Sequence, residues 1–151
     1  LAWSHNNWGS WYDMQVMAVR MGTLSEYVHV GVAWVIAGRI FVIEAVSPRI
    51  RIYPLSKLLP FYWMMVGDEH WDDSTEEYAL SLVGMKYSKW DALKAFFHKL
   101  VPGVNNEWQC AEMVINILNR KNIVPSDVAA TPAELVKFLQ KDYPLYFVDK
   151  E

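Results

Sequence analysis

The stretch "YVHVGVAWVI", residues 27–36, constrains the fold more than any other part of the chain. Its side chains alternate strictly between two kinds, which predicts a β-strand with two unlike faces. One face carries His29 with the small residues Gly31 and Ala33 and then Val35, and the other carries larger apolar residues: Val28, Val30, Val32, Trp34 and Ile36. Because small residues leave room for a close approach, we expect another element to pack near His29.

Strand-like patterns continue along the chain and then give way to helical ones. Further strands are predicted over 40–46, 49–53 and 61–66, with a turn at 37–39, so a meandering antiparallel sheet is the economical arrangement. Helical spacing of apolar residues predicts helices over 11–21, 74–83, 89–100, 106–119 and 131–141. Their N-cap signals include Ser74 with Glu77, Asn106 with Gln109, and Thr131 with Pro132 and Glu134. A sheet followed by helices predicts an α+β fold.

Length and charge limit the possible partners. The 151 residues are enough for one compact domain, and we expect a single domain over 1–151. A formal net charge of -3 and the lack of a long Lys/Arg run argue against nucleic acid as a partner. The longest apolar stretches are far shorter than the roughly 18 residues of a membrane span, so we expect a soluble protein with no integral membrane segment. Oligomeric state and compartment stay open.

Glu44 is unusual because it is one carboxylate within the apolar run "RIFVIEAV". If the turn at 37–39 pairs residue 36 with residue 39, then Glu44 lies opposite Gly31 and on the same face as His29. The carboxylate could then hold the imidazole in one tautomer and stabilise its protonated form. The alternative, equally weighted from the sheet alone, is an edge strand on which Glu44 faces water.

Cys110 is the single cysteine, and it lies near the predicted start of a helix in "NEWQCAEMV". The positive end of the helix dipole and a neighbouring imidazolium would both favour a thiolate nucleophile. The alternative, more common for a lone cysteine, is a small buried hydrophobic residue. The nucleophile hypothesis predicts that this helix packs on the small-residue face that carries His29.

Together these motifs, with "LVGMKYSKWD" and "IVPSDVAATPAEL", resemble the circularly permuted, NlpC-like (YiiX-type) branch of papain-fold cysteine peptidases and amidases. The resemblance covers the chain from Ser10 onward and implies a permuted papain-like fold with catalytic residues in the order His29, Glu44, Cys110. Val28 and Ala111 depart from the family pattern without removing a catalytic group, and Glu112 is interpreted as structural. The family's opening Gly-Asp strand is not recognisable here, so we expect the N-terminal strand to be degenerate or to lie before Leu1.

The resemblance also implies a reaction and a substrate class. Cys110 would attack an amide carbonyl, with the oxyanion held partly by the Cys110 N–H, and His29 would serve as acid and then base. Trp108 and Gln109 would line the site, while Tyr87 either shapes the pocket or packs in the core. The implied substrates are cell-wall peptides or related isopeptides, including peptidoglycan, in a bacterial or phage cell-envelope context, and, second, lipid esters or amides of the lecithin:retinol acyltransferase-like type. No cofactor is expected.

Two other kinds of function compete with the cysteine hydrolase: a metal site and a non-catalytic binding module. His29, His70, Glu44 and Cys110 match no closed zinc-ligand spacing, so we expect no metal, and His5 and His98 carry no signal. A non-catalytic wall-binding or scaffold module is the stronger competitor, because aromatic residues that could stack on sugars gather near the start: Trp3, Trp8, Trp11 and Tyr12. Replacement of Cys110 distinguishes the binding module from the cysteine hydrolase, because only the hydrolase would lose its function.

Overall fold

The computed structural model describes residues 2–3, 27, 29–46, 49–67, 71–86, 107–127 and 131–149, and in these parts the protein is α+β, as predicted. The described strands are β1 (Ala2–Trp3), β2 (His29–Ile36), β3 (Arg39–Val46), β4 (Arg49–Pro54), β5 (Phe61–Trp63) and β6 (Tyr146–Val148). The described helices are α2 (Asp73–Leu82), α4 (Glu107–Arg120) and α5 (Pro132–Leu139), with a short 3-10 helix η1 (Leu55–Lys57) after β4.

The described strands pair antiparallel in the order β4-β3-β2-β1-β5-β6. The predicted meander is therefore confirmed for β2, β3 and β4. The strand predicted over 61–66 is shorter and ends at Trp63. Two strands were not predicted from the sequence: β1, which pairs with both β2 and β5, and β6, which pairs with β5.

A two-residue turn sets the register of the β2–β3 hairpin. Ala37 and Gly38 both have positive φ, 48° and 74°, as in the type I′ turn that suits the twist of a hairpin. Ile36 consequently pairs with Arg39, and Gly31 lies directly opposite Glu44. The register predicted from the sequence is confirmed.

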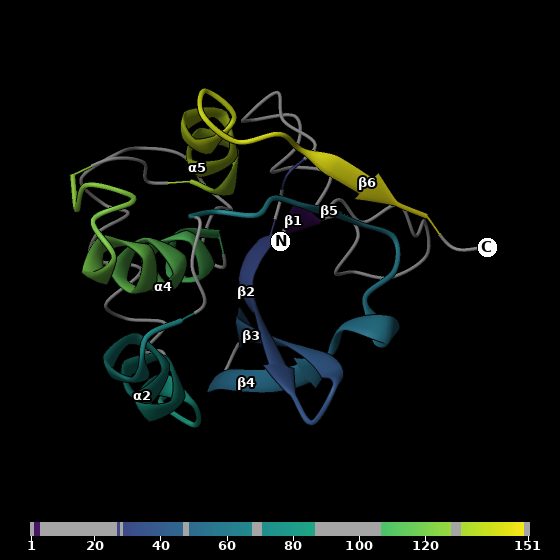
Figure 1. Ribbon diagram of the computed structural model, residues 1–151, viewed down its shortest axis with the longest axis vertical. Coiled ribbons are helices and arrows are strands. Elements are labelled where there is room, and N and C mark those ends of the chain that lie inside the picture. The colour runs from purple at the N-terminus through teal and green to yellow at the C-terminus, as the bar shows by residue number, and fades with distance from the viewer. Residues whose placement is uncertain are drawn as a thin grey trace.

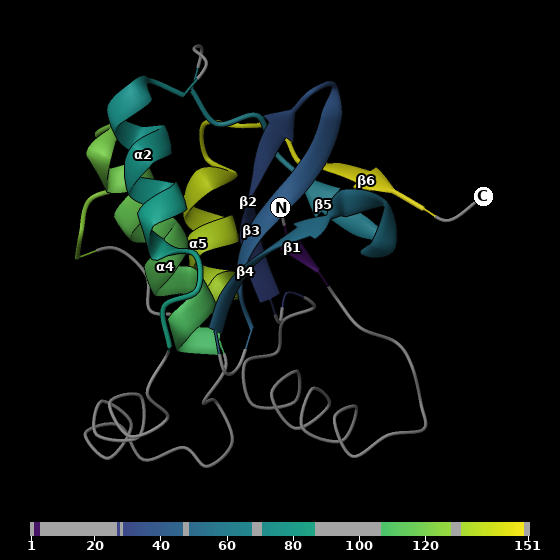
Figure 2. The same ribbon diagram turned by 90° about the horizontal axis from the view of Figure 1, so that it is seen from below.

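The sheet separates two groups of apolar side chains. Val30, Ile43 and Ile50 belong to a large core cluster that also contains the buried residues of α4 and α5. Val42 belongs to a smaller cluster with Phe61 and the apolar side chains around η1. Figures 1 and 2 show the same division, with α2, α4 and α5 on one side of β2–β4 and with β5 and β6 on the other.

The helix starts follow their capping residues. α5 has the predicted capping box, in which the Thr131 side chain accepts the N–H of Glu134 and the Glu134 carboxylate accepts the N–H of Thr131. The predicted cap at Ser74 is wrong: Asp72 caps α2, and its carboxylate accepts the Thr75 N–H at 2.8 Å. The Ser74 hydroxyl donates to Asp72 instead, because a carboxylate is the stronger acceptor.

The predicted ends of the other described helices differ slightly from the observed ends. α4 reaches Arg120 and α5 ends at Leu139, within two residues of the predicted limits. The helices predicted over 11–21 and 89–100 lie outside the described residues. Of the helices that are described, none has the length and apolar character needed to cross a bilayer.

Candidate active site

A histidine and a carboxylate meet across β2 and β3. The His29 Nε2 atom lies 2.8 Å from Oε2 of Glu44, and the two side chains are 15% and 1% exposed. The sequence predicted this meeting from register alone, since Glu44 opposite Gly31 is a diagonal neighbour of His29. The alternative of an edge strand with Glu44 in water is wrong: β3 lies between β2 and β4, and Glu44 is buried.

Arg51 on β4 is the second partner of this carboxylate, and it was not predicted from the sequence. It lies directly opposite Glu44, to whose Oε1 it donates from Nε at 2.8 Å, with Nη2 at 2.7 Å. The signal was present in the sequence, because a two-residue connection at 47–48 pairs residue 46 with 49 and therefore 44 with 51. Glu44 thus has a basic partner on each side.

The third predicted residue, Cys110, lies in the first turn of α4. Its sulfur is not part of a disulfide and has no exposed surface, and the residue belongs to the large core cluster. Burial by itself lowers the pKa of His29, but the charge of Cys110, a hydrogen bond with its side chain, and the hydrogen bond and charge of Glu44 raise that pKa to about 9. The structure therefore connects the sulfur to the imidazole.

The position of α4 relative to the sheet differs from the one predicted from the sequence. α4 packs against β2 and β3, but its cluster includes Val30 and Ile43, which alternate along their strands with His29 and Glu44. The body of α4 therefore covers the face opposite to the one predicted. His29 is the first residue of β2 and Cys110 lies in the first turn of α4, so the two residues interact where both elements begin.

The Glu44 carboxylate remains ionised inside this arrangement. Burial raises its pKa, but the hydrogen bond and charge of His29, followed by those of Arg51, bring the pKa below its ordinary value of 4.5. The sulfur, the imidazole, the carboxylate and the guanidinium therefore follow one another in a row across the beginning of α4 and the strands β2, β3 and β4. Because Glu44 occupies Nε2, Nδ1 is the ring nitrogen through which His29 can exchange a proton with the sulfur or a substrate.

The remaining predicted residues are only partly described. Tyr87 and His70 lie outside the described residues, and Trp108 and Gln109 are placed as residues of α4 without a description of their side chains. Glu112 is exposed while Cys110 is buried, which confirms that it points away from the sulfur. Within the described ranges, no three His, Cys, Asp or Glu side chains are arranged to hold a metal ion.

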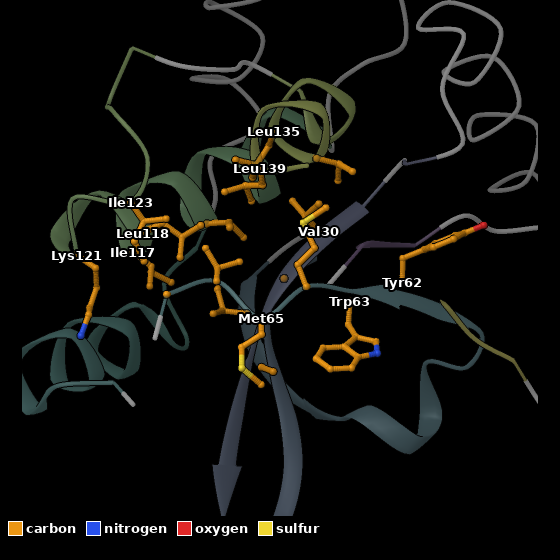
Figure 3. Close-up of a pocket in the computed structure, with 18 of the residues that line it drawn as sticks. Val30, Tyr62, Trp63, Met65, Ile117, Leu118, Lys121, Ile123, Leu135 and Leu139 are labelled. Atoms are coloured by element: carbon orange, nitrogen blue, oxygen red, sulfur yellow. The ribbon is translucent and has the colours of Figure 1, made fainter. Parts of the chain in front are cut away.

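An apolar cavity of about 640 Å³ lies beside this site, and it was not predicted from the sequence. It begins next to the site, since Val30 and Gly31 follow His29 in β2 and Val114 follows Cys110 by one helical turn. Figure 3 shows side chains of α4, α5 and β2 surrounding it, with Lys121 at one end, where its amino group lies 3.0 Å from Asp72. The labelled aliphatic lining is Val30, Met65, Ile117, Leu118, Ile123, Leu135 and Leu139, and Tyr62 and Trp63 of β5 are the labelled aromatic residues.

Comparison of the chain with protein-family models, with curated proteins and with solved structures gave no match in any of the three. The assignment of a chemistry to this site therefore depends on its own geometry and on the resemblance described above.

Proposed function

We propose that this protein is a cysteine-dependent hydrolase that cleaves an amide bond through a thioester, with Cys110 as nucleophile, His29 as acid and base, and Glu44 as the group that orients His29. The observation that carries the proposal is the row from sulfur to imidazole to carboxylate. Within this row, the His29 Nε2 atom lies 2.8 Å from the Glu44 Oε2 atom, and the Cys110 side chain shares a hydrogen bond with His29. A buried cysteine with a purely packing role would need neither a charged partner nor a carboxylate behind that partner.

The proposed reaction begins with a thiolate–imidazolium pair. The sulfur attacks the carbonyl carbon, a C–S bond forms, and the carbonyl electrons move to oxygen. When the C–N bond breaks, the leaving amine takes the proton from His29 Nδ1, and an acyl thioester remains. His29 then removes a proton from water, which attacks the thioester carbonyl, and the C–S bond breaks to restore the thiolate. Glu44 stays ionised throughout and stabilises the imidazolium.

The first turn of α4 is the proposed source of oxyanion stabilisation. Cys110 is the fourth residue of α4, where a regular helix directs the N–H to a carbonyl of the preceding turn. The N–H groups of the first three residues have no acceptor within the helix. We therefore assign the oxyanion donors to the backbone N–H groups of Glu107–Gln109 in place of the Cys110 N–H.

The proposed substrate is a cell-wall peptide or a related isopeptide, in line with the resemblance to NlpC-like enzymes, and the proposed fold is the permuted papain-like one. The sulfur has no exposed surface, whereas the His29 side chain is 15% exposed. A substrate carbonyl would approach from the side of the imidazole, and side chains over the sulfur would have to move.

Alkylation of Cys110 tests the chemistry before any substrate is known. Cys110 is the single thiol, so the mass of one carboxamidomethyl group reports this site alone. We expect iodoacetamide to modify the native protein at pH 6, well below the ordinary pKa of a thiol, about 8.5. His29→Gln should slow the reaction by about 10²-fold, the lower end for loss of an acid–base partner. Glu112→Gln, an exposed charge change near the sulfur, is the matched control.

Activity provides the second test. Hydrolysis of peptidoglycan fragments should disappear in Cys110→Ala and in His29→Gln. If Cys110→Ala keeps its full function, or if native Cys110 reacts no faster than in His29→Gln, the hydrolase proposal fails. The non-catalytic binding module would then be the better hypothesis.

The apolar cavity favours a second candidate, a hydrolase or acyltransferase acting on lipid esters or amides. Its volume lies within the range of sites for small apolar ligands, and it starts one helical turn from Cys110. The experiment is hydrolysis of p-nitrophenyl esters with acyl chains of increasing length. Leu118→Trp, which fills the cavity from a half-buried position, should reduce kcat/KM for long chains and leave short chains unchanged. Equal loss for all chain lengths, or for none, would contradict this candidate.

A further inference from the structure

Among the described residues of the candidate site, Arg51 contacts Glu44 alone, and the proposed chemistry gives Arg51 no role. Its Nε and Nη2 atoms both lie within 2.8 Å of Glu44 Oε1, whereas His29 contacts Oε2. The two oxygens of the carboxylate therefore have different partners on opposite sides of β3. A carboxylate held in this way has one oxygen directed at the imidazole and cannot turn without breaking the arginine contacts.

The guanidinium is itself held in place. The Arg51 guanidinium carbon lies 4.2 Å from the centre of the Tyr53 ring, two residues further along β4 on the same face. Its side chain is 45% exposed, but the carboxylate that it contacts is 1% exposed. Because the carboxylate is out of water, this contact is not equivalent to an ion pair between two solvated side chains.

Arg49 shows that the position of Arg51 is specific. It has the same side chain, lies on the same face of β4 and is exposed, yet it makes no side-chain hydrogen bond or ion pair with the described residues. Register explains the difference, since Arg49 lies opposite Val46 and Arg51 lies opposite Glu44.

We propose that Arg51 is a positioning residue of the site, which keeps Glu44 ionised and its Oε2 atom directed at His29. The proposal rests on the hydrolase function proposed above, because it assigns Arg51 a role in the reactivity of Cys110. Arg51 acts through Glu44 and His29 and does not touch the reacting atoms.

The electrostatics agree with this geometry. Among the described residues, the ionisable groups that act on Glu44 are His29 from β2 and Arg51 from β4, and both lower the Glu44 pKa against the effect of burial. Without Arg51, Oε1 would be a buried acceptor without its charged donor, and protonation of the carboxylate would become easier. A protonated Glu44 would no longer stabilise the imidazolium, and the thiolate would lose its partner.

The direct test is the titration of Glu44 by ¹³C NMR of glutamate side-chain carboxyl groups, with the resonance assigned from its loss in Glu44→Gln. In Arg51→Met the midpoint should move to higher pH. In Arg51→Lys, which keeps one charge and one donor, the movement should be smaller. Arg49→Met is the matched control and should leave the midpoint unchanged.

The linked test is the alkylation rate of Cys110 at pH 6. Arg51→Met should slow it on the order of tenfold, the effect expected from one lost hydrogen bond to a charged group. Arg51→Lys should retain most of the native alkylation rate. The control Arg49→Met should react at the native rate. Thermal unfolding of each variant establishes that it is folded, and Arg51→Gln, which removes the charge but keeps a polar side chain, carries the test with the same expected direction if Arg51→Met does not fold.

Two different results separate this proposal from the hydrolase function. If Arg51→Met leaves both the Glu44 titration and the alkylation rate unchanged, Arg51 is a surface ion-pair residue and the positioning role is wrong. If native Cys110 reacts no faster than in His29→Gln, the hydrolase function fails, whatever the titration of Glu44 shows about Arg51. A moved titration together with a slowed, lysine-rescued alkylation supports the proposed role.

Discussion

Replacing Glu44 with glutamine removes the charge at the centre of the site while keeping the shape of the side chain. Glutamine has one carbonyl oxygen and one amide group, so it cannot accept hydrogen bonds from both His29 and Arg51 as the carboxylate does. The imidazolium then lacks its anionic partner. We expect a less stable protein and a lower pKa of His29.

The size of the effect follows from burial. A hydrogen bond to a charged group contributes about 1.5 to 3 kcal/mol, and His29 and Glu44 are mostly buried, so their bond lies within that range. The Arg51 side chain is 45% exposed, and solvent screening reduces its share. The expected loss in free energy of unfolding at pH 7 is about 2 to 3 kcal/mol, which corresponds to a Tm lower by about 5 to 10 °C in a chain of this size.

The pH dependence has a definite sign. The pKa of His29 is raised from 6.5 to about 9, so protonation of His29 stabilises the folded state fully below pH 6.5, and this stabilisation is lost as pH rises through about 9. The difference in Tm between the native protein and Glu44→Gln should therefore shrink as pH rises through about 9. The pKa of Glu44 is lowered, so its own contribution is present above pH 4.5 and is lost at lower pH.

The assays are thermal unfolding by circular dichroism from pH 5 to 10 and NMR titration of the His29 ring. In Glu44→Gln the His29 midpoint should fall below about 9, while Glu112→Gln, at an exposed position of α4, should leave both the midpoint and Tm unchanged. An unchanged His29 midpoint in Glu44→Gln would refute the coupling between the two residues. It would also remove the reason for assigning Glu44 an orienting role.

Three further predictions concern single positions elsewhere in the fold and at the sulfur. Ala37 has a φ of 48° beside Gly38, so Ala37→Asn should stabilise the hairpin by about 0.5 to 1 kcal/mol, measured by urea unfolding, because asparagine tolerates positive φ. Thr131→Ala should lower stability by about 1 kcal/mol in the same assay through loss of the α5 capping box, with Thr131→Ser close to the native value. Cys110→Ala should lower the pKa of His29 from about 9 in the NMR titration, because the charge and hydrogen bond of Cys110 contribute to raising it; an unchanged midpoint would separate the sulfur from the ring.

The hairpin register was predictable because its determinants are local. Alternation in 28–36 fixes the faces of β2, and a two-residue turn fixes the partner of every residue in β3, so the His29–Glu44 pair followed without knowledge of the rest of the chain. The α5 capping box was predictable for the same reason, since Thr131 and Glu134 are three residues apart. The same local reasoning applied to 46–49 would have identified Arg51.

Features that depend on distant partners were not predictable. β1 has two residues and β6 has three, too few for a periodic pattern, and their pairing depends on β5. The face of the sheet covered by α4 was predicted wrongly from the small residues of β2, since face selection depends on the side chains of both elements and their neighbours. The apolar cavity likewise depends on how the side chains of β2, α4 and α5 pack around it, and no short sequence motif predicts that packing.

The arrangement of the site reconciles two opposing requirements. The helix that carries the proposed nucleophile must bury an apolar stripe to be held rigidly, but charged side chains beneath that stripe would interrupt the core. Here the body of α4 packs on the Val30 side of the sheet, while Glu44 lies on the other side with the basic residues of two neighbouring strands. Only the beginnings of α4 and β2 need to meet, so the sulfur can belong to the apolar cluster and still interact with the imidazole. A thiol moved one turn along α4, to Val114, would face the apolar cavity without that ring, which is why Val114→Cys in a Cys110→Ala background should not restore alkylation at pH 6.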